Sequence, residues 1–422
     1  MRVVVLGGGS SGEHFVGALR RLDNEAELTL VERRLVGGEC SYWACMPTKT
    51  MLRAPELVAA ARHAPGVEVT GLVPAEVFRW RELVVDGRDD SSQAAWLESQ
   101  ECELVRGDGV VAEPGVVRVD ERAVPYDRLV IATGSSPVVP PVFDGLDYWT
   151  NREATETTEV PGTLLVVGAG PVGCELAQFF ARVGAKVTLV EGGERLLPQV
   201  DAEAAALVQR GLEEDGVEIR LGELVSDKGF LAGFDRVLVA TGRRANVDGL
   251  DALGLNVSRR GIEVDERMRA AEDVWAIGDV TGIAPFTHVG KYHARVAAYG
   301  IAGRDVRADH RAVPATIFTD PQVATVGRLD GRIGRWELTS TPRLSTYERP
   351  KRPGFVKVAA DPERRVLTGA VAVGPEAGEW LQQLTLAIRA EVPIETLLDV
   401  IPPYPTFSEA VFLALRELNL DR

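Results

Sequence analysis

The chain has 422 residues, 45% of them hydrophobic, which is enough for several domains with buried cores. Its 62 acidic and 47 basic residues give a formal net charge of −15, which argues against nucleic acid or an anionic membrane surface as a partner, because both would repel it. The first residues are not expected to form a secretory signal, and no apolar run approaches the ~18 residues of a membrane helix. We therefore expect a cytoplasmic protein. In that reducing compartment, its four cysteines are not expected to form a structural disulfide framework.

The first predicted element is a strand that ends in a glycine-rich turn. Gly7, Gly9 and Gly12 follow a β-branched run in G-x-G-x-x-G spacing and lead into a helix-like segment. Glycines at these positions permit a tight turn and close approach to a pyrophosphate, and the helix N-terminus offers it free N–H groups. Glu32 ends the next apolar run, where its carboxylate can accept hydrogen bonds from a ribose. We therefore predict a dinucleotide site in this segment.

Two of the four cysteines follow at once, in "GGECSYWACMPTK". Cys40 and Cys45 are separated by four residues, and a zinc site usually spaces its cysteines by two to four residues but needs four ligands. Cys102 and Cys174 are the remaining thiols, and both are expected to be structural. The histidines are scattered along the chain at His14, His63, His288, His293 and His310. We predict no metal site, and a static disulfide would be unusual in a reducing compartment.

The strand, turn and helix pattern returns near the middle of the chain. Gly168, Gly170 and Gly173 repeat the spacing of the first turn, and Glu191 repeats the acid at the end of the following apolar run. An acid at this place favours NAD over NADP, because it repels a 2′-phosphate. NADP is not excluded, since three arginines lie nearby in sequence: Arg195, Arg243 and Arg244.

A second pair of matching segments follows the two turns. The segments "YDRLVIATGSSP" and "FDRVLVATGRRA" each run from an apolar strand into Ala-Thr-Gly, which places Thr133, Gly134 and Gly242 after strands. A strand that ends in Thr-Gly suits a backbone that passes close to a nucleotide. Two long matching units predict two doubly wound α/β domains, each of which binds a dinucleotide.

This ordered set of motifs resembles the pyridine nucleotide–disulfide oxidoreductase family, which includes lipoamide dehydrogenase, glutathione reductase and mercuric reductase. The resemblance also rests on "VWAIGDVTG", "VPATIFTDPQVATVG", "GAVAVGPEAGE" and "YPTFSE", and it covers nearly the whole chain. It implies that the first dinucleotide is FAD and the second is NAD(H). It also implies that Asp279, in "IGDV", contacts the FAD. The expected FAD-binding domain comprises residues 1–150 and a return segment, 271–308. The expected NAD(P)-binding domain comprises residues 151–270, and a C-terminal α+β dimerisation domain comprises residues 309–422.

The resemblance also implies roles for the cysteine segment. Cys45 is the thiol that faces the flavin, and Cys40 exchanges with a disulfide substrate. A short helix at this place is expected to lower the thiol pKa through its dipole. Lys49 and Glu175 are expected to form an ion pair beside the flavin. The large residues Tyr42 and Trp43 leave two interpretations open, a reshaped substrate entrance or helix packing.

The C-terminal motif departs from the family pattern at the position of a catalytic histidine. The family's disulfide reductases have His-Pro-Thr followed by a glutamate, whereas this chain has Tyr404 at the histidine position and keeps Glu409. A phenol with a pKa of ~10 is a poor base at neutral pH. Tyr404 is therefore expected either to donate a proton or simply to pack. The absence of a cysteine after Cys174 argues against mercuric reductase and against thioredoxin reductases with a C-terminal thiol pair.

These observations predict a homodimeric flavoenzyme that passes electrons between NAD(P)H, FAD and a Cys40–Cys45 disulfide, to or from a small disulfide or dithiol. The partner's C-terminal segment is expected to complete each active site. Two alternatives stay open. The first is a diaphorase or quinone reductase that does not use the thiols, and the second is a nucleotide-sensing protein whose catalytic residues are vestigial.

Overall fold

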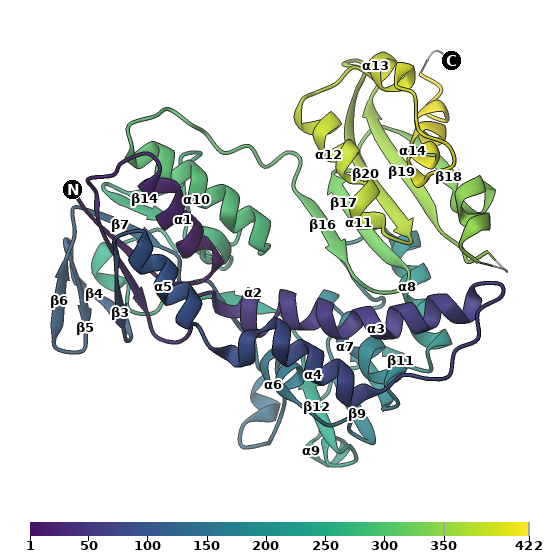
Figure 1. The fold of residues 1–422 in the computed structure, drawn as a ribbon, viewed down its shortest axis with the longest axis horizontal. Helices are drawn as coiled ribbons and strands as arrows, with labels where there is room; N and C mark the ends of the chain where they lie inside the picture. The colour runs from purple at the N-terminus through teal and green to yellow at the C-terminus, as the bar shows by residue number, and fades with distance from the viewer. Residues whose placement is uncertain (349–350, 421–422) are drawn as a thin grey trace. The chain divides into compact units, whose positions relative to one another are not determined.

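The computed structural model describes residues 1–348 and 351–420, and the chain divides into two compact units (Figure 1). The first unit comprises Met1–Pro47, Trp80–Val138 and Gly242–Asp309. The second comprises Thr48–Arg79, Val139–Thr241 and His310–Arg422. Each unit has its own sheets and its own buried side chains, and each is described by itself below.

A six-stranded sheet forms the centre of the first unit, in the order β14-β15-β7-β1-β2-β3. Its strands are β1 (Arg2–Leu6), β2 (Glu27–Glu32), β3 (Cys102–Arg106), β7 (Arg128–Ile131), β14 (Arg269–Ala271) and β15 (Val274–Ala276). All neighbours are parallel except β14 and β15. The central strands are nearly continuous runs of buried aliphatic residues, as expected for a parallel sheet covered on both faces.

Helices and smaller sheets complete the first unit. Helix α1 packs against α10, and α5 packs against β3. The helices that lie wholly in this unit are α1 (Ser10–Arg20), α2 (Gly38–Tyr42), α5 (Ser91–Ser99) and α10 (Thr287–Ile301). An antiparallel sheet consists of β4 (Gly109–Glu113), β5 (Val116–Val119) and β6 (Arg122–Pro125), and a two-stranded ribbon pairs β8 (Ser135–Pro137) with β13 (Arg243–Ala245). The division between the units falls inside α3 (Cys45–His63) and α4 (Pro74–Val84).

The second unit contains a parallel sheet in the order β11-β10-β9-β12. Its strands are β9 (Thr163–Val167), β10 (Lys186–Glu191), β11 (Glu218–Leu221) and β12 (Arg236–Val239). Four helices belong to the same stretch of chain: α6 (Asn151–Glu156), α7 (Pro171–Arg182), α8 (Ala202–Glu214) and α9 (Lys228–Leu231). The strand, turn and helix order of β9, α7 and β10 repeats that of β1, α1 and β2.

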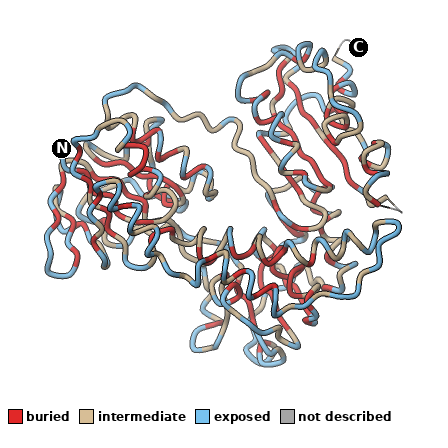
Figure 2. The backbone as a smooth tube through the Cα atoms, in the orientation of Figure 1, coloured by how far each residue is buried: buried red, intermediate tan, exposed pale blue. Residues whose placement is uncertain are grey.

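An antiparallel sheet follows in the C-terminal part of the second unit. Its order is β16-β17-β20-β19-β18, and its strands are β16 (Pro314–Ile317), β17 (Gln322–Gly327), β18 (Arg332–Glu337), β19 (Phe355–Asp361) and β20 (Val366–Gly374). Helices α11 (Ala377–Trp380), α12 (Gln382–Arg389), α13 (Ile394–Asp399) and α14 (Phe407–Arg416) follow it. Figure 2 shows that the buried residues in these sheets are concentrated along the strands. Among the described helices, none is both long and apolar enough to cross a membrane.

These elements confirm the predicted fold class, two doubly wound α/β regions and a C-terminal α+β region. The chain returns to the first unit at Gly242, before residue 271, where the predicted return segment begins. The earlier return follows from the pairing of β13 with β8. The domain limits given above from the sequence remain a prediction.

Candidate functional site

The first glycine turn connects β1 to α1. Gly7 has a φ of +111°, which favours glycine, and a Cβ on Gly12 would stand 2.1 Å from the Gly7 carbonyl oxygen. At Gly9, by contrast, a Cβ would meet nothing within 4 Å. Gly7 and Gly12 thus allow the turn and α1 to approach each other, whereas Gly9 faces open space at the helix N-terminus. That open space fits the pyrophosphate of a dinucleotide.

Glu32 fixes the same turn from the end of β2. One carboxylate oxygen accepts the Gly8 N–H at 2.7 Å, and the other accepts the Arg34 N–H at 2.7 Å. The carboxylate is thereby held at the edge of the sheet next to the turn. Its remaining lone pairs are the groups that a ribose would use.

The second glycine turn has the same construction in the other unit. Gly168 has a φ of +103°, a Cβ on Gly173 would stand 1.9 Å from the Gly168 carbonyl oxygen, and Gly170 faces open space. Glu191 accepts the N–H groups of Ala169 and Gly193, each at 2.8 Å. The two turns are therefore alike in backbone and in side-chain support, as the repeated spacing predicted.

Asp279 lies with Thr133 and Gly134 in the first unit. It belongs to a short 3-10 helix, Gly278–Thr281, and accepts a hydrogen bond from the Ser135 hydroxyl at 2.7 Å. The backbone turns at Gly134 with a φ of +71° and open space beside its Cα. Gly242, in the matching segment, has a φ of +124° and also faces open space.

Two polar residues of this region, Ser135 and Asn246, were not predicted, and Arg243 was named only as an arginine that leaves NADP possible. Arg243 donates to the Ser135 hydroxyl at 2.8 Å and to its carbonyl oxygen at 2.7 Å. The backbone carbonyl oxygen of Asn246 accepts a hydrogen bond from the Thr133 hydroxyl at 2.6 Å. More than 100 residues separate these groups in sequence, and only the pairing of β8 with β13 brings them together. The repeated Thr-Gly segments were the one signal that could have indicated the pairing.

Cys40 and Cys45 both belong to the first unit and lie on two successive helices. Cys40 is in α2, Cys45 is the first residue of α3, and no disulfide joins them in this structure. The Cys45 sulfur lies 3.3 Å from the hydroxyl of Thr287, the first residue of α10. The pKa of Cys40 is raised by a hydrogen bond with Cys45 and by burial, although Thr287 and Lys291 oppose the shift. The expected lowering of the thiol pKa is therefore wrong for Cys40, because α2 is only five residues long and its dipole does not outweigh these effects.

Tyr42 and Trp43 are part of a small buried cluster with Val85. Their rings meet edge to face with centroids 5.7 Å apart, and burial raises the pKa of Tyr42 to about 12. Of the two interpretations left open by the sequence, the structure supports helix packing.

Lys49 and Glu175 form the predicted ion pair within the second unit. The Lys49 ammonium lies 2.7 Å from the Glu175 carboxylate, whose side chain is only 3% exposed. The other carboxylate oxygen accepts the Phe318 N–H at 2.9 Å, and Lys49 also lies 5.0 Å from the centre of the Phe318 ring. Phe318 was not predicted, because its backbone N–H gives no sequence signal.

Tyr404 and Glu409, the two predicted residues of the C-terminal motif, differ in their exposure to solvent. Tyr404 is 72% exposed, and no hydrogen bond joins it to Glu409 among residues 1–348 and 351–420. One Glu409 carboxylate oxygen is buried without a hydrogen-bond partner within the described part of the chain. The same part contains no cluster of three or more histidine, cysteine or acidic residues that could hold a metal ion.

Two dinucleotide turns, one of them followed directly by a thiol pair, define an oxidoreductase that uses two nucleotide cofactors. Comparison with known proteins agrees with this class. Residues 1–299 match the family model described as pyridine nucleotide-disulphide oxidoreductase, and residues 313–415 match the dimerisation domain of that family.

Individual relatives match over nearly the full chain. The chain is 32% identical to dihydrolipoyl dehydrogenase 2 of Haloarcula marismortui, over 97% of this chain and 94% of the relative. It is 31% identical to mercuric reductase of Shigella flexneri, over 98% of this chain and 80% of the relative. The crystal structure of LpdA from Mycobacterium tuberculosis matches with a TM-score of 0.88 and 26% identity over 99% of both chains.

The chain belongs to the pyridine nucleotide-disulphide oxidoreductase family. It is an FAD-dependent, NAD(P)H-linked flavoprotein oxidoreductase, as the sequence predicted.

Proposed function

We propose that the chain uses NADH to reduce a small-molecule disulfide, with FAD at the first glycine turn and with Cys40 and Cys45 as the redox pair. When bound, FAD and the nicotinamide supply the hydride and electron chemistry. The observation that carries the proposal is the contact between the two thiols, together with the Thr287 hydroxyl 3.3 Å from Cys45. Cys40 exchanges with the substrate, and Cys45 closes the disulfide again.

The preference for NADH is supported by the second turn. Glu191 places a carboxylate where NADP would carry its 2′-phosphate. The guanidinium of Arg195 is already used, because it donates hydrogen bonds to the carbonyl oxygens of Leu197, Pro198 and Val200. The arginine nearest to Glu191 in sequence is therefore committed to the backbone of its own loop.

The proposed assembly is a homodimer. The C-terminal region matches a dimerisation domain and exposes large apolar side chains, with Ile401 90% exposed and Leu386 and Val400 also open to solvent. Side chains of this size are expected to be covered by a partner. We also propose a cytoplasmic location, since none of the four cysteines is in a disulfide in the described residues, which suits a reducing compartment.

Anaerobic titration of the FAD-loaded protein with NADH and with NADPH tests the proposal. We expect a long-wavelength thiolate–flavin absorbance band after two electrons, at a lower concentration of NADH than of NADPH. The Cys45→Ser variant should bind FAD but lack the band. An intact protein that takes up two electrons without forming the band would contradict the use of the thiols.

A matched variant separates the proposal from thiol-independent chemistry. Cys40→Ser should abolish turnover of 2-hydroxyethyl disulfide and leave the reduction of a quinone by NADH unchanged. A diaphorase would reduce the quinone but not the disulfide, and Cys40→Ser would not change its quinone activity. A nucleotide-sensing protein would not oxidise NADH with either acceptor.

A further inference from the structure

Helix α10 differs in charge from the chain as a whole. The chain has 62 acidic residues and a net charge of −15, but Thr287–Ile301 contains no aspartate or glutamate. The exposed residues of this helix are His288, Lys291 and Arg295, whose spacing of three and four residues places them on one face. His288 stacks on Phe286, and Lys291 and Arg295 form what we call the basic face of α10.

The basic face begins one helical turn from the thiol pair. Thr287, the first residue of α10, has its hydroxyl 3.3 Å from the Cys45 sulfur. The pKa of Cys40 is raised by its hydrogen bond with Cys45 and by burial, and the charge of Lys291 is among the effects that oppose this shift. An α-helix rises about 1.5 Å per residue, so Lys291 follows Thr287 by about 6 Å along the axis and Arg295 by about 12 Å. A small molecule whose sulfur meets Cys40 is therefore within reach of Lys291, and a longer one of Arg295.

The packing of α10 leaves this face open. A Cβ on Gly290 would stand 2.2 Å from the Ser11 hydroxyl, so another side of the helix lies against α1. His293 is fully buried, and its ring accepts the Gly278 N–H at 3.3 Å. These two contacts fix the orientation of α10 about its own axis, and with it the direction in which the basic face points.

Neither cation of the basic face is neutralised by an ion pair. Within residues 1–348 and 351–420, no carboxylate is close enough to form one with Lys291 or Arg295. The Arg295 guanidinium lies 5.2 Å from the centre of the Tyr292 ring, and this contact leaves its charge in place. Both charges are therefore available to an anionic group.

Two carboxylates of the same region do not cancel this charge. Burial raises the pKa of Glu13 to about 7 against the opposing charge of Lys291, so Glu13 is only about half ionised at neutral pH. Glu39 precedes Cys40, and its carboxylate lies 3.8 Å from the Arg243 guanidinium. The surroundings of the outer thiol therefore keep a net positive charge.

We propose that the substrate is a small disulfide with an acidic group such as a carboxylate, and that Lys291 and Arg295 bind this group while Cys40 attacks the disulfide. The inference rests on the proposed function and names its substrate class. The Cys40 thiolate attacks one substrate sulfur, the substrate S–S bond breaks, and the departing thiolate takes a proton from solvent. The Cys45 thiolate then attacks Cys40, and the second product leaves as a thiolate that solvent also protonates. The substrate gains two electrons, which the thiol pair loses as it becomes a disulfide and which NADH restores.

A first experiment measures the charge preference of Cys40 without requiring turnover. Iodoacetate and iodoacetamide alkylate the same thiolate, so the ratio of their rates at Cys40 does not depend on the thiol pKa. FAD-loaded protein is reduced with dithiothreitol, desalted under nitrogen and alkylated, and Cys40 is followed by peptide mass spectrometry. Lys291→Met should lower the ratio of the iodoacetate rate to the iodoacetamide rate about 5-fold, and Arg295→Met about 2-fold because it is one turn farther away.

Arg304→Met is the matched control for these variants. Arg304 lies beyond the far end of α10, and its guanidinium is 5.1 Å from the centre of the Tyr299 ring, much as Arg295 lies over Tyr292. Its replacement changes the total charge equally and should leave the ratio unchanged. A ratio that stays the same in Lys291→Met, or that falls equally in Arg304→Met, would overturn the proposal.

A second experiment compares three disulfides of similar length, with NADH as the electron donor. We expect kcat/KM to fall from 3,3′-dithiodipropionate, a dianion, through the neutral 2-hydroxyethyl disulfide to cystamine, a dication. In the double variant Lys291→Met/Arg295→Met, the ratio of the first value to the second should drop about 10-fold. Equal values in wild type, or a preference for cystamine, would overturn the proposal and leave the proposed function standing. Failure of the proposed function would instead appear as no reduction of any disulfide and a missing thiolate–flavin band, and the alkylation ratio would still decide whether the basic face attracts anions.

Discussion

At Glu175 one buried carboxylate binds groups from two distant segments of the chain. Its two oxygens accept from Lys49 and from the Phe318 N–H. Lys49 is about one-third exposed, so solvent weakens the ionic part of the interaction. The Phe318 N–H donates to the other oxygen of this carboxylate, whose side chain is itself buried, and a hydrogen bond to a charged acceptor contributes more than one to a neutral acceptor. Most of the contribution of Glu175 to stability therefore comes from the backbone hydrogen bond.

Two substitutions at this residue separate the ionic part from the hydrogen bond. Glu175→Ala removes both, and we expect a loss of roughly 1–3 kcal/mol in the free energy of unfolding. Glu175→Gln keeps a carbonyl oxygen for Phe318 and should lose less. Urea denaturation of both variants, followed by circular dichroism, measures the difference. Equal losses in the two variants would show that the ion pair dominates instead.

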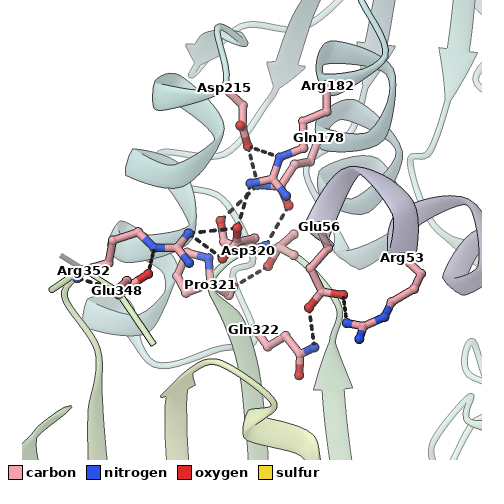
Figure 3. A network of polar contacts seen from close by, with 11 residues as sticks. Arg53, Glu56, Gln178, Arg182, Asp215, Asp320, Pro321, Gln322, Glu348 and Arg352 are labelled. Carbon is pink, nitrogen blue, oxygen red and sulfur yellow. Dashed lines mark hydrogen bonds and ion pairs between the residues drawn. The ribbon is translucent and has the colours of Figure 1, made fainter. Parts of the chain in front are cut away.

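On the scale of elements, α7 fixes a loop of the C-terminal sheet through one of its faces. Glu175, Gln178 and Arg182 follow at helical spacing and reach the segment from Phe318 to Asp320. Figure 3 shows Asp320 between Arg182 and Arg352, with Gln178 bound to its backbone. Burial alone would raise the pKa of Asp320, but the charges of Arg352 and Arg182 outweigh it and hold the pKa below its usual value.

The stability that Asp320 contributes should depend on pH. A carboxylate whose pKa is lower in the folded state stabilises the fold fully above its unfolded pKa of ~3.9, and this contribution is lost as the pH falls through the folded value. Asp320→Asn should therefore cost about 3 kcal/mol at pH 7, because two arginines lose their shared partner, and progressively less below pH ~4. Urea midpoints between pH 3 and 7 measure this trend.

The exposed ion pair of Arg2 and Asp127 provides the control for that series. Its partners are joined at 2.6 Å, but both are open to solvent. Asp127→Asn should shift the urea midpoint at pH 7 far less than Asp320→Asn does. A similar shift for both would contradict the importance of burial at Asp320.

The two parts of the site differ in how far sequence alone predicts them. Gly7, Gly12 and Glu32 belong to one strand, turn and helix unit, so their spacing in the sequence predicts the turn. The second turn repeats the same spacing. Thr287 and Asp320 act through contacts with residues more than 100 positions away. No periodicity encodes such contacts, because they depend on how helices and loops pack. Tyr404 shows the same limit, since its position in the motif did not predict that its side chain would be 72% exposed.

At the scale of the whole molecule, the exposed apolar side chains of the C-terminal region predict self-association. Ile401→Asp places a charge where we expect a partner to cover an apolar group, which is costly when the charge is unpaired. We expect the variant to sediment as a monomer in analytical ultracentrifugation, whereas wild type sediments as a dimer. Leu224→Asp is the matched control, because Leu224 is 83% exposed outside the C-terminal region. A dimeric Ile401→Asp protein would exclude this surface from the interface.

The polar face of α7 also restricts how the second unit can move. Four hydrogen bonds, from Glu175, Gln178 twice and Arg182, join α7 to Phe318 and Asp320, and all four would have to break before the two sheets of this unit could hinge apart. The N-terminus of the same helix forms the second glycine turn. The parallel and antiparallel sheets of the unit should therefore travel as one body, and a nicotinamide nucleotide that binds at that turn, as we propose, would exchange by movements of loops and side chains.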